Sequence, residues 1–197
     1  MEWGFAGVSE STPVKEGVNH SVWSHWVDSR YAVGDEIPVD EGDMYDLGNG
    51  LCLEHGHAWH PHLGRVAGHE ELWRDVEVRS TTDDGGKVCV VLRCGGKGDG
   101  DGGVRGVVVR VGQFVEGIVR VGERVATERW EFRFKDEDGG GGREGTGGLK
   151  KGWMRVARTR DLFLPCAVTF MPEVLGLGGR VTYGDFEWVV EEVWEWE

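Results

Sequence analysis

The sequence predicts an all-β protein. Apolar, β-branched and aromatic residues alternate with polar ones along several short runs, which is the period of an extended strand. The chain of 197 residues contains 34 glycines and only five prolines, and most of the glycines fall in turns or in two glycine-rich tracts. Several short antiparallel strands with frequent reversals are typical of a β-barrel or a β-sandwich, and helices are not favoured.

Strands in the first part of the chain are indicated by bulky residues and by one turn signal. Residues 19–30 place large side chains such as Trp23 and Trp26 on both sides of an extended strand. Further along, Asn49-Gly50 separates two short runs within residues 43–56. Because this dipeptide readily adopts the positive φ angles of a tight type I′ turn, the segment predicts a β-hairpin.

A polar, turn-rich segment at residues 79–87 marks the predicted boundary between two domains, residues 1–84 and residues 85–197. The charge is uneven between them. The first domain holds 17 acidic and 5 basic residues, a net charge of −12, and the whole chain carries −13 at pH 7. An acidic surface repels nucleic acid and anionic membranes, so neither is an expected partner.

The second domain contains the clearest strand patterns. Its expected strands cover residues 88–94, residues 106–122 as two strands that meet near Gly112 and Gln113, residues 124–135, residues 152–160 and residues 180–194. Trp130 and Phe132 point to one side of their strand, with Glu128 as a polar exception on that side. Trp188 and Val190 likewise share a side. We expect each aromatic face to be buried and each opposite face to meet water.

Two glycine-rich tracts, residues 94–103 and residues 136–148, are expected to be flexible hairpin loops or disordered insertions. Each of them spells GxGxxG. A dinucleotide site requires a preceding strand and a following helix, whereas strands follow here, so we expect no nucleotide and no other cofactor.

Neither a membrane-spanning segment nor a targeting segment is recognisable. No run approaches the roughly 18 apolar residues of a spanning helix, and the N-terminus lacks a basic segment followed by an apolar one. The chain is therefore expected to be soluble and intracellular, without membrane insertion. In that setting its four cysteines, none of them in a CxxC pair, are expected to be free thiols.

Candidate metal ligands gather in the stretch LCLEHGHAWHPHLG. Its histidines are His55, His57, His60 and His62. Imidazole nitrogens bind zinc, but this spacing is not that of an established zinc module, so the sequence leaves metal binding open. No GxSxG elbow or other nucleophile motif is present, and the sequence predicts no catalytic residues.

Two aromatic sets are candidate binding residues. Trp130, Phe132 and Trp188 would line the interior of a barrel in the second domain, since a barrel of about eight strands can enclose one small apolar ligand. Trp194 and Trp196 alternate with glutamates at the C-terminus and would be exposed if the last strand ends before them. Exposed aromatic rings beside acids suit a contact with a protein partner, although the rings could equally pack onto the end of the barrel.

Seven segments spread over nearly the whole chain carry a resemblance to a known family. They are EWGFAG (2–7), HWVDSR (25–30), DEGDMYDLGNG (40–50), EELWRDVE (70–77), GVVVRVGQFVEGIVRVGERVATERWEF (106–132), DLFLPCAV (161–168) and the terminal GDFEWVVEE. Together they resemble the Hri-one family of fungal proteins, which is named for its interaction with a casein-kinase-I homologue. None of the segments is a catalytic signature.

The resemblance implies two successive lipocalin-like β-barrels, a cytoplasmic and nuclear location, and no enzymatic activity. It further implies protein partners, including a casein-kinase-I-type kinase and a component of the protein-translocation machinery. In the family the segment like EWGFAG follows several tens of residues, so this chain is expected to begin within its first barrel. A barrel without its opening strands would leave unpaired backbone groups at a sheet edge.

The expected function is that of a non-enzymatic protein-interaction protein. The alternative is a carrier that holds a small hydrophobic molecule inside the second barrel. Native mass spectrometry separates the two hypotheses, because reproducible small-molecule adducts are expected only for the carrier.

Overall fold

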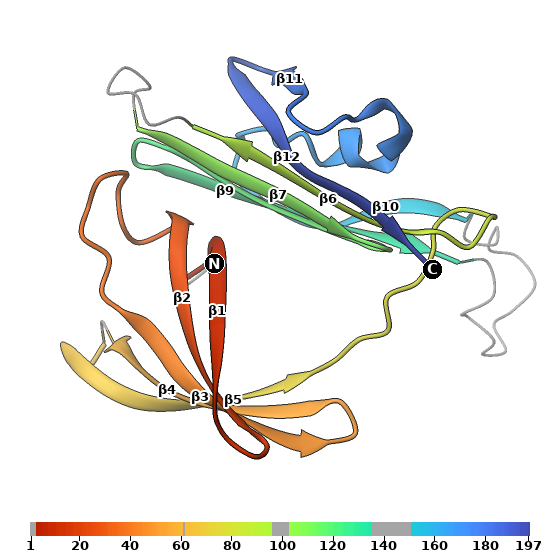
Figure 1. The fold of residues 1–197 in the computed structure, drawn as a ribbon. Helices are drawn as coiled ribbons and strands as arrows, with labels where there is room; N and C mark the ends of the chain where they lie inside the picture. The colour runs from red at the N-terminus through yellow and green to blue at the C-terminus, as the bar shows by residue number, and fades with distance from the viewer. Residues whose placement is uncertain (1–2, 61, 96–102, 135–150) are drawn as a thin grey trace, which may run out of the picture. The chain divides into compact units, whose positions relative to one another are not determined.

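The computed structural model describes residues 3–60, 62–95, 103–134 and 151–197. These residues form two compact units, an N-terminal unit at residues 3–77 and a C-terminal unit at residues 78–197. Each unit contains one antiparallel sheet, and two short 3-10 helices are the only helical elements among the described residues. The all-β prediction is therefore confirmed (Figure 1).

The N-terminal unit is a five-stranded meander in which each strand pairs with its neighbour in sequence. Its strands are β1 (Phe5–Lys15), β2 (Val18–Asp28), β3 (Asp40–Gly48), β4 (Leu51–His60) and β5 (Arg65–Arg74). Asn49 and Gly50 have φ angles of 55° and 69°, so the predicted tight hairpin between β3 and β4 is confirmed. The sequence pattern missed β1, because nearly all of its side chains are exposed and no apolar period marks it.

A β-bulge between β1 and β2 positions the buried polar residues of this unit. Gly7 pairs with His25 and Phe5 pairs with Asp28, with a shift of register between the two pairs. In a regular strand His25 and Asp28 would point to opposite faces, but the extra residue of the bulge turns them to the same side. Gly7 is required here, because a Cβ atom would lie 1.8 Å from the carbonyl oxygen of Ser24.

The C-terminal unit is a seven-stranded sheet with the strand order β10-β9-β8-β7-β6-β12-β11. Its elements are β6 (Lys87–Cys94), β7 (Val104–Val111), β8 (Phe114–Val121), β9 (Arg124–Arg133), β10 (Gly152–Thr159), η1 (Cys166–Phe170), η2 (Pro172–Val174), β11 (Arg180–Tyr183) and β12 (Phe186–Trp196). The strands predicted for this part are present, and residues 180–194 divide into a hairpin around Gly184. The tract 136–148 and most of the tract 94–103 lie outside the described residues.

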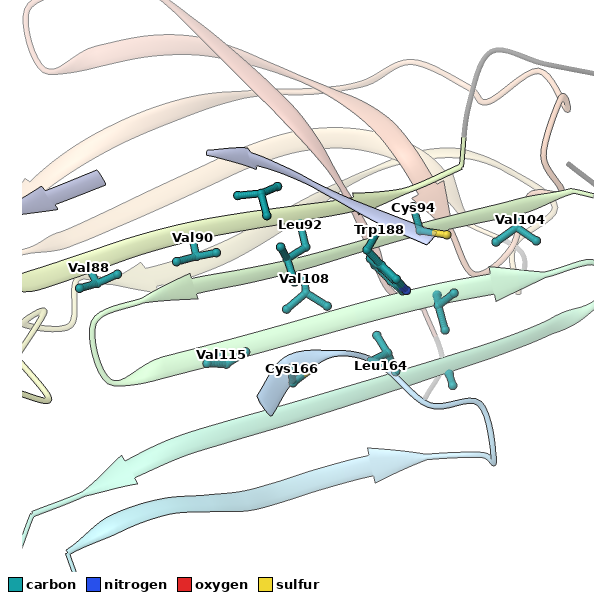
Figure 2. Packing of buried hydrophobic residues seen from close by; sticks show 13 residues of the cluster. Val88, Val90, Leu92, Cys94, Val104, Val108, Val115, Leu164, Cys166 and Trp188 are labelled. Atoms are coloured by element: carbon teal, nitrogen blue, oxygen red, sulfur yellow. The ribbon is translucent and has the colours of Figure 1, made fainter. Parts of the chain in front are cut away.

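The core of the C-terminal unit covers one face of its sheet (Figure 2). Its buried residues are Val88, Val90, Leu92, Cys94, Val104, Val108, Val115, Val119, Ala126, Leu164, Cys166, Trp188 and Val190. Leu164 precedes η1 and Cys166 is its first residue, and the sequence pattern did not identify this segment as part of the core. This segment lies close to the sheet at Gly117, where a Cβ atom would be 2.7 Å from Leu164.

Gly106→Ala is expected to destabilise the C-terminal unit by about 1–3 kcal/mol, because overpacking a filled core displaces its neighbours. A Cβ atom at this position would lie 2.5 Å from Cη2 of the fully buried Trp188. Urea unfolding followed by tryptophan fluorescence measures the change. Gly176→Ala is the control, since no atom lies within 4 Å of a Cβ placed there. Equal losses for the two variants would contradict close packing at Trp188.

The two units divide between Glu77 and Val78, earlier than the boundary after Asp84 that composition indicates. Hydrogen bonds explain the difference. The backbone N–H of Arg79 donates to the side-chain oxygen of Gln113 at 2.7 Å, and Arg110 donates to the hydroxyl of Thr81 at 2.7 Å. The polar segment 79–87 therefore belongs to the C-terminal unit, although its sequence is typical of a linker.

Neither sheet closes into a barrel among the described residues. β1 and β5 are the edge strands of the N-terminal sheet, and β10 and β11 are the edge strands of the C-terminal sheet. Within the C-terminal unit the first strand, β6, pairs with the last strand, β12, so the two ends of the unit are neighbours in the sheet. No helix in the described part of the chain has the length and the apolar character that a membrane crossing requires.

Candidate functional site

Trp194 and Trp196 are exposed aromatic residues on β12, where 61% and 40% of their surfaces are accessible. The strand continues to Trp196 instead of ending before the pair. Both rings therefore lie on one face of a hydrogen-bonded strand, because residues two apart in a strand point the same way. Their partners across the sheet are Cys89 and Lys87 of β6. A partner that binds these rings would find their backbone already ordered.

One carboxylate shares a face of β12 with this tryptophan pair. The indole N–H of Trp194 donates to Glu192 at 3.1 Å, and Glu192 shares the face of the two rings. Glu195 is also exposed but lies on the opposite face of the strand, and Glu191 forms an ion pair with Arg93 at 3.0 Å. We call Glu192, Trp194 and Trp196 the C-terminal tryptophan patch. Its combination of apolar area and negative charge suits a protein surface that is both apolar and basic.

The three residues predicted to line a ligand site in the second domain lie in packed surroundings. Trp188 is fully buried over Gly106. The ring of Trp130 meets Phe170 edge-on with centroids 5.2 Å apart, and Phe132 meets Trp153 in the same way at 5.5 Å. Trp130 and Phe132 are half-buried, and the binding of a ligand by these three residues stays a prediction.

The four histidines for which the sequence leaves metal binding open do not converge. His55 and His57 are exposed on one face of β4, with ring centroids 5.6 Å apart. His60 points to the opposite face, where its ring lies 5.9 Å from that of His69, and His62 follows β4 in an exposed turn. Within the described ranges no group of three His, Cys, Asp or Glu side chains is arranged to hold a metal ion.

His25, Asp28 and Asp40 form a buried network in the N-terminal unit. Nδ1 of His25 lies 2.8 Å from a carboxylate oxygen of Asp28, and Nε2 lies 3.0 Å from one of Asp40. The side chains are 2%, 0% and 11% exposed, respectively. No local sequence signal links the three residues, because β3 brings Asp40 into place across the sheet.

Asp28 is the centre of this network. Besides His25, it accepts a hydrogen bond from the indole N–H of Trp3 at 3.1 Å and one from the backbone N–H of Arg30 at 2.6 Å. The ring of Phe5 stacks on the imidazole of His25, with centroids 3.7 Å apart. The segment EWGFAG thus contributes two aromatic side chains that cover and anchor the network.

The network holds His25 in its charged form. Burial lowers the pKa of His25, but hydrogen bonds to Asp28 and Asp40 outweigh burial and raise this pKa from 6.5 to about 9. Burial also opposes the ionisation of Asp28, yet its hydrogen bonds, that with His25 first, lower its pKa. At neutral pH both ring nitrogens of His25 therefore carry protons that are already donated, and no lone pair is left for a general base.

Comparison with known proteins identifies one family. A family model described as Protein HRI1 matches residues 1–192 of the chain. No curated protein and no solved structure matches it.

Proposed function

The chain belongs to the HRI1 family, and we propose that it is a non-enzymatic protein-interaction protein of the cytoplasm and nucleus. The observation that carries this proposal is the C-terminal tryptophan patch. Its two indole rings are 61% and 40% exposed on a strand whose backbone is held in the sheet. Tryptophan is enriched among the residues that dominate the binding energy of protein interfaces, and an ordered backbone lowers the entropic cost of binding.

A casein-kinase-I-type kinase is the partner that we propose for the patch. Most of the net charge of −13 lies in residues 1–84, so the negative charge beside the rings comes from the glutamates that flank them, and these favour a partner with basic and apolar surface. Opposite charges also accelerate the encounter of two proteins. The same negative charge argues against nucleic acid as a partner.

Calorimetry with a purified casein-kinase-I-type kinase tests the proposal. The double variant Trp194→Ala, Trp196→Ala is expected to bind roughly 30-fold more weakly or worse, as for loss of an interface hot spot. Leu177→Ala is the control, because this apolar residue of the same unit is 77% exposed and lies outside the patch. Unchanged affinity of the double variant would remove the patch from the proposal. Failure of the unchanged protein to bind would remove the kinase as its partner.

The absence of enzymatic activity is part of the proposal, and the state of His25 supports it. Among the described histidines His25 has the largest pKa shift, and groups in clefts with strongly shifted pKa values are the usual candidates for catalysis. Its two N–H groups are both occupied by carboxylates. The network therefore uses its charges to stabilise the fold.

We further propose that each sheet corresponds to one lipocalin-like barrel of the family. Bulges in the β1–β2, β9–β10 and β12–β6 pairs support this assignment, because bulges bend strands and help sheets to curl. A carrier function for the second barrel has less support. The packing of Trp130, Phe132 and Trp188 favours a filled interior over a ligand cavity.

A further inference from the structure

A small hollow opens beside the buried network of the N-terminal unit. It is shallow and open to solvent, and it is lined by Trp3, His25, Arg30, Tyr31, Ile37, Pro38, Val39, Asp40, Ala58 and Trp59. Three of these residues are aromatic and four more are aliphatic. This lining is more apolar than the surrounding acidic surface, which suits a small ligand with a hydrocarbon part.

One carboxylate at the hollow uses only one of its two oxygens for a hydrogen bond to a described residue. Asp40 accepts a hydrogen bond from His25 through Oδ2, and its other oxygen, Oδ1, makes no hydrogen bond to any described residue. The side chain of Asp40 is 11% exposed. An ionised carboxylate has room for several donors, so a ligand in the hollow that carries an N–H group can bond to this oxygen.

The same place already holds a cation against an aromatic ring. The guanidinium carbon of Arg30 lies 4.6 Å from the ring centroid of Trp3. This distance is typical of a cation–π contact, in which the electron-rich ring face attracts positive charge. Tyr31 and Trp59 also line the hollow, and no cation–π contact to either is present among the described residues.

We propose that the hollow binds a small organic ammonium ion, with its N–H group on Asp40 and its alkyl part against Tyr31 and Trp59. The charged groups that face it are His25, Arg30 and Asp40, and Asp28 lies directly behind His25. The two aspartates balance His25 and Arg30. An ammonium ligand therefore enters a site without net charge, where aromatic faces and one carboxylate oxygen favour it over a neutral molecule of the same shape.

The proposal makes Arg30 a competitor of the ligand. Its guanidinium occupies the face of Trp3 and repels a second cation in the hollow. Replacing Arg30 by glutamine removes this charge and frees the ring face. Arg30→Gln should therefore bind the ammonium ligand more tightly than the unchanged protein. A purely structural role of the hollow would not produce this gain in affinity.

Titration of the full chain with n-butylammonium, N,N,N-trimethylbutylammonium and 1-butanol tests the proposal. Shifts of the indole and amide signals of Trp3, Tyr31 and Trp59 in ¹H–¹⁵N spectra report binding. We expect n-butylammonium to bind with a dissociation constant on the order of 1 mM, because so small a ligand offers little contact area. The trimethyl compound should bind more weakly since it lacks an N–H group, and 1-butanol should bind weakest.

Three variants and one control complete the test. Asp40→Asn keeps an acceptor for His25 but removes the charge, and should weaken butylammonium binding about tenfold or more. Trp59→Ala, at a residue that is 43% exposed, should weaken it several-fold without disturbing the fold. Arg30→Gln should strengthen it several-fold. Trp194→Ala in the other unit should leave it unchanged, which separates this site from the proposed kinase contact.

Three results would overturn the proposal. The first is the absence of signal shifts with butylammonium at concentrations well above 1 mM. The second is equal binding of 1-butanol and butylammonium, which would show an apolar hollow with no preference for a cation. The third is unchanged affinity in both Asp40→Asn and Trp59→Ala, since these variants remove the carboxylate charge and an aromatic wall independently.

Discussion

Asp28→Ala is expected to destabilise the N-terminal unit by about 3–5 kcal/mol, enough to unfold a unit of marginal stability. The carboxylate accepts hydrogen bonds from His25, from the indole of Trp3 and from the backbone of Arg30, and none of its side chain is exposed. Without it, these donors are left in a buried site, and the charge of His25 keeps only Asp40 as a partner. Breaking a buried charge pair by removing one partner is costly for this reason.

The same sheet supplies a matched control for this variant. His20 and Asp43 also form a histidine–aspartate pair at 2.9 Å, but their side chains are 37% and 42% exposed. Asp43→Ala is therefore expected to change stability very little, because water replaces the lost contact. Residue-resolved hydrogen exchange of β2 and β3 measures both variants. Similar loss of protection in the two variants would contradict a special role for burial at Asp28.

A dependence on pH follows from the raised pKa of His25. The folded-state pKa of about 9 lies above the ordinary value of 6.5, so the protonated form stabilises the unit fully below pH 6.5. This stabilisation, about 3 kcal/mol, is lost as the pH rises from 6.5 through 9. Asp28 has a lowered pKa, and its contribution is lost only as the pH falls below its ordinary value of 3.8. Asp28→Ala should flatten the alkaline loss, since His25 then lacks its closest partner.

Arg110→Met is expected to destabilise the C-terminal unit by about 3–5 kcal/mol. Arg110 is 1% exposed and donates to the carbonyl oxygens of Gly112 and Thr169 and to the hydroxyl of Thr81. Burial lowers its pKa to about 10, although the nearby charge of Glu173 acts in the opposite direction. Methionine fills similar space but leaves the three acceptors without a donor, and η1 and the segment 79–87 lose their common anchor.

The rate at which a thiol reagent labels Cys166 measures how often the segment around η1 opens in this variant. Cys166 in η1 is fully buried, and burial raises the pKa of its thiol, so it should react slowly with thiol reagents in the unchanged protein. In Arg110→Met, mass spectrometry should detect faster labelling of Cys166. Arg129→Met is the control, because Arg129 is about half exposed and contacts Glu116 and Glu131 at the surface. Slow labelling in both variants would show that Arg110 does not anchor η1.

Local sequence signals predicted the strands and turns where they were strong. The Asn49-Gly50 hairpin is present with both residues at positive φ, and the β-branched runs of the C-terminal unit form strands close to the predicted bounds. Glu128, the polar exception in an apolar face, is buried and forms an ion pair with Arg155 at 3.1 Å. The alternation pattern marked this residue as unusual, but β10 was needed to reveal its partner.

Other features left no local signal. Arg110 lies in a run of valines, and a strand pattern does not tell a buried arginine from one at the surface. His25 finds its partner Asp40 on β3, and the aromatic residues that cover it, Trp3 and Phe5, come from the start of the chain. The bulge opposite Gly7 also turns Asp28 to the same face as His25, whereas regular alternation would place the two residues on opposite faces.

By itself, the sequence determined the all-β class, the positions of most strands and turns, and the family, because alternation, turn residues and residue order are written along the chain. The tertiary structure alone decided which charges are buried, which tryptophans are covered and which are exposed. Those properties depend on contacts between strands far apart in sequence. A pairing register sets such contacts, and a single bulge can reverse the side on which a residue lies.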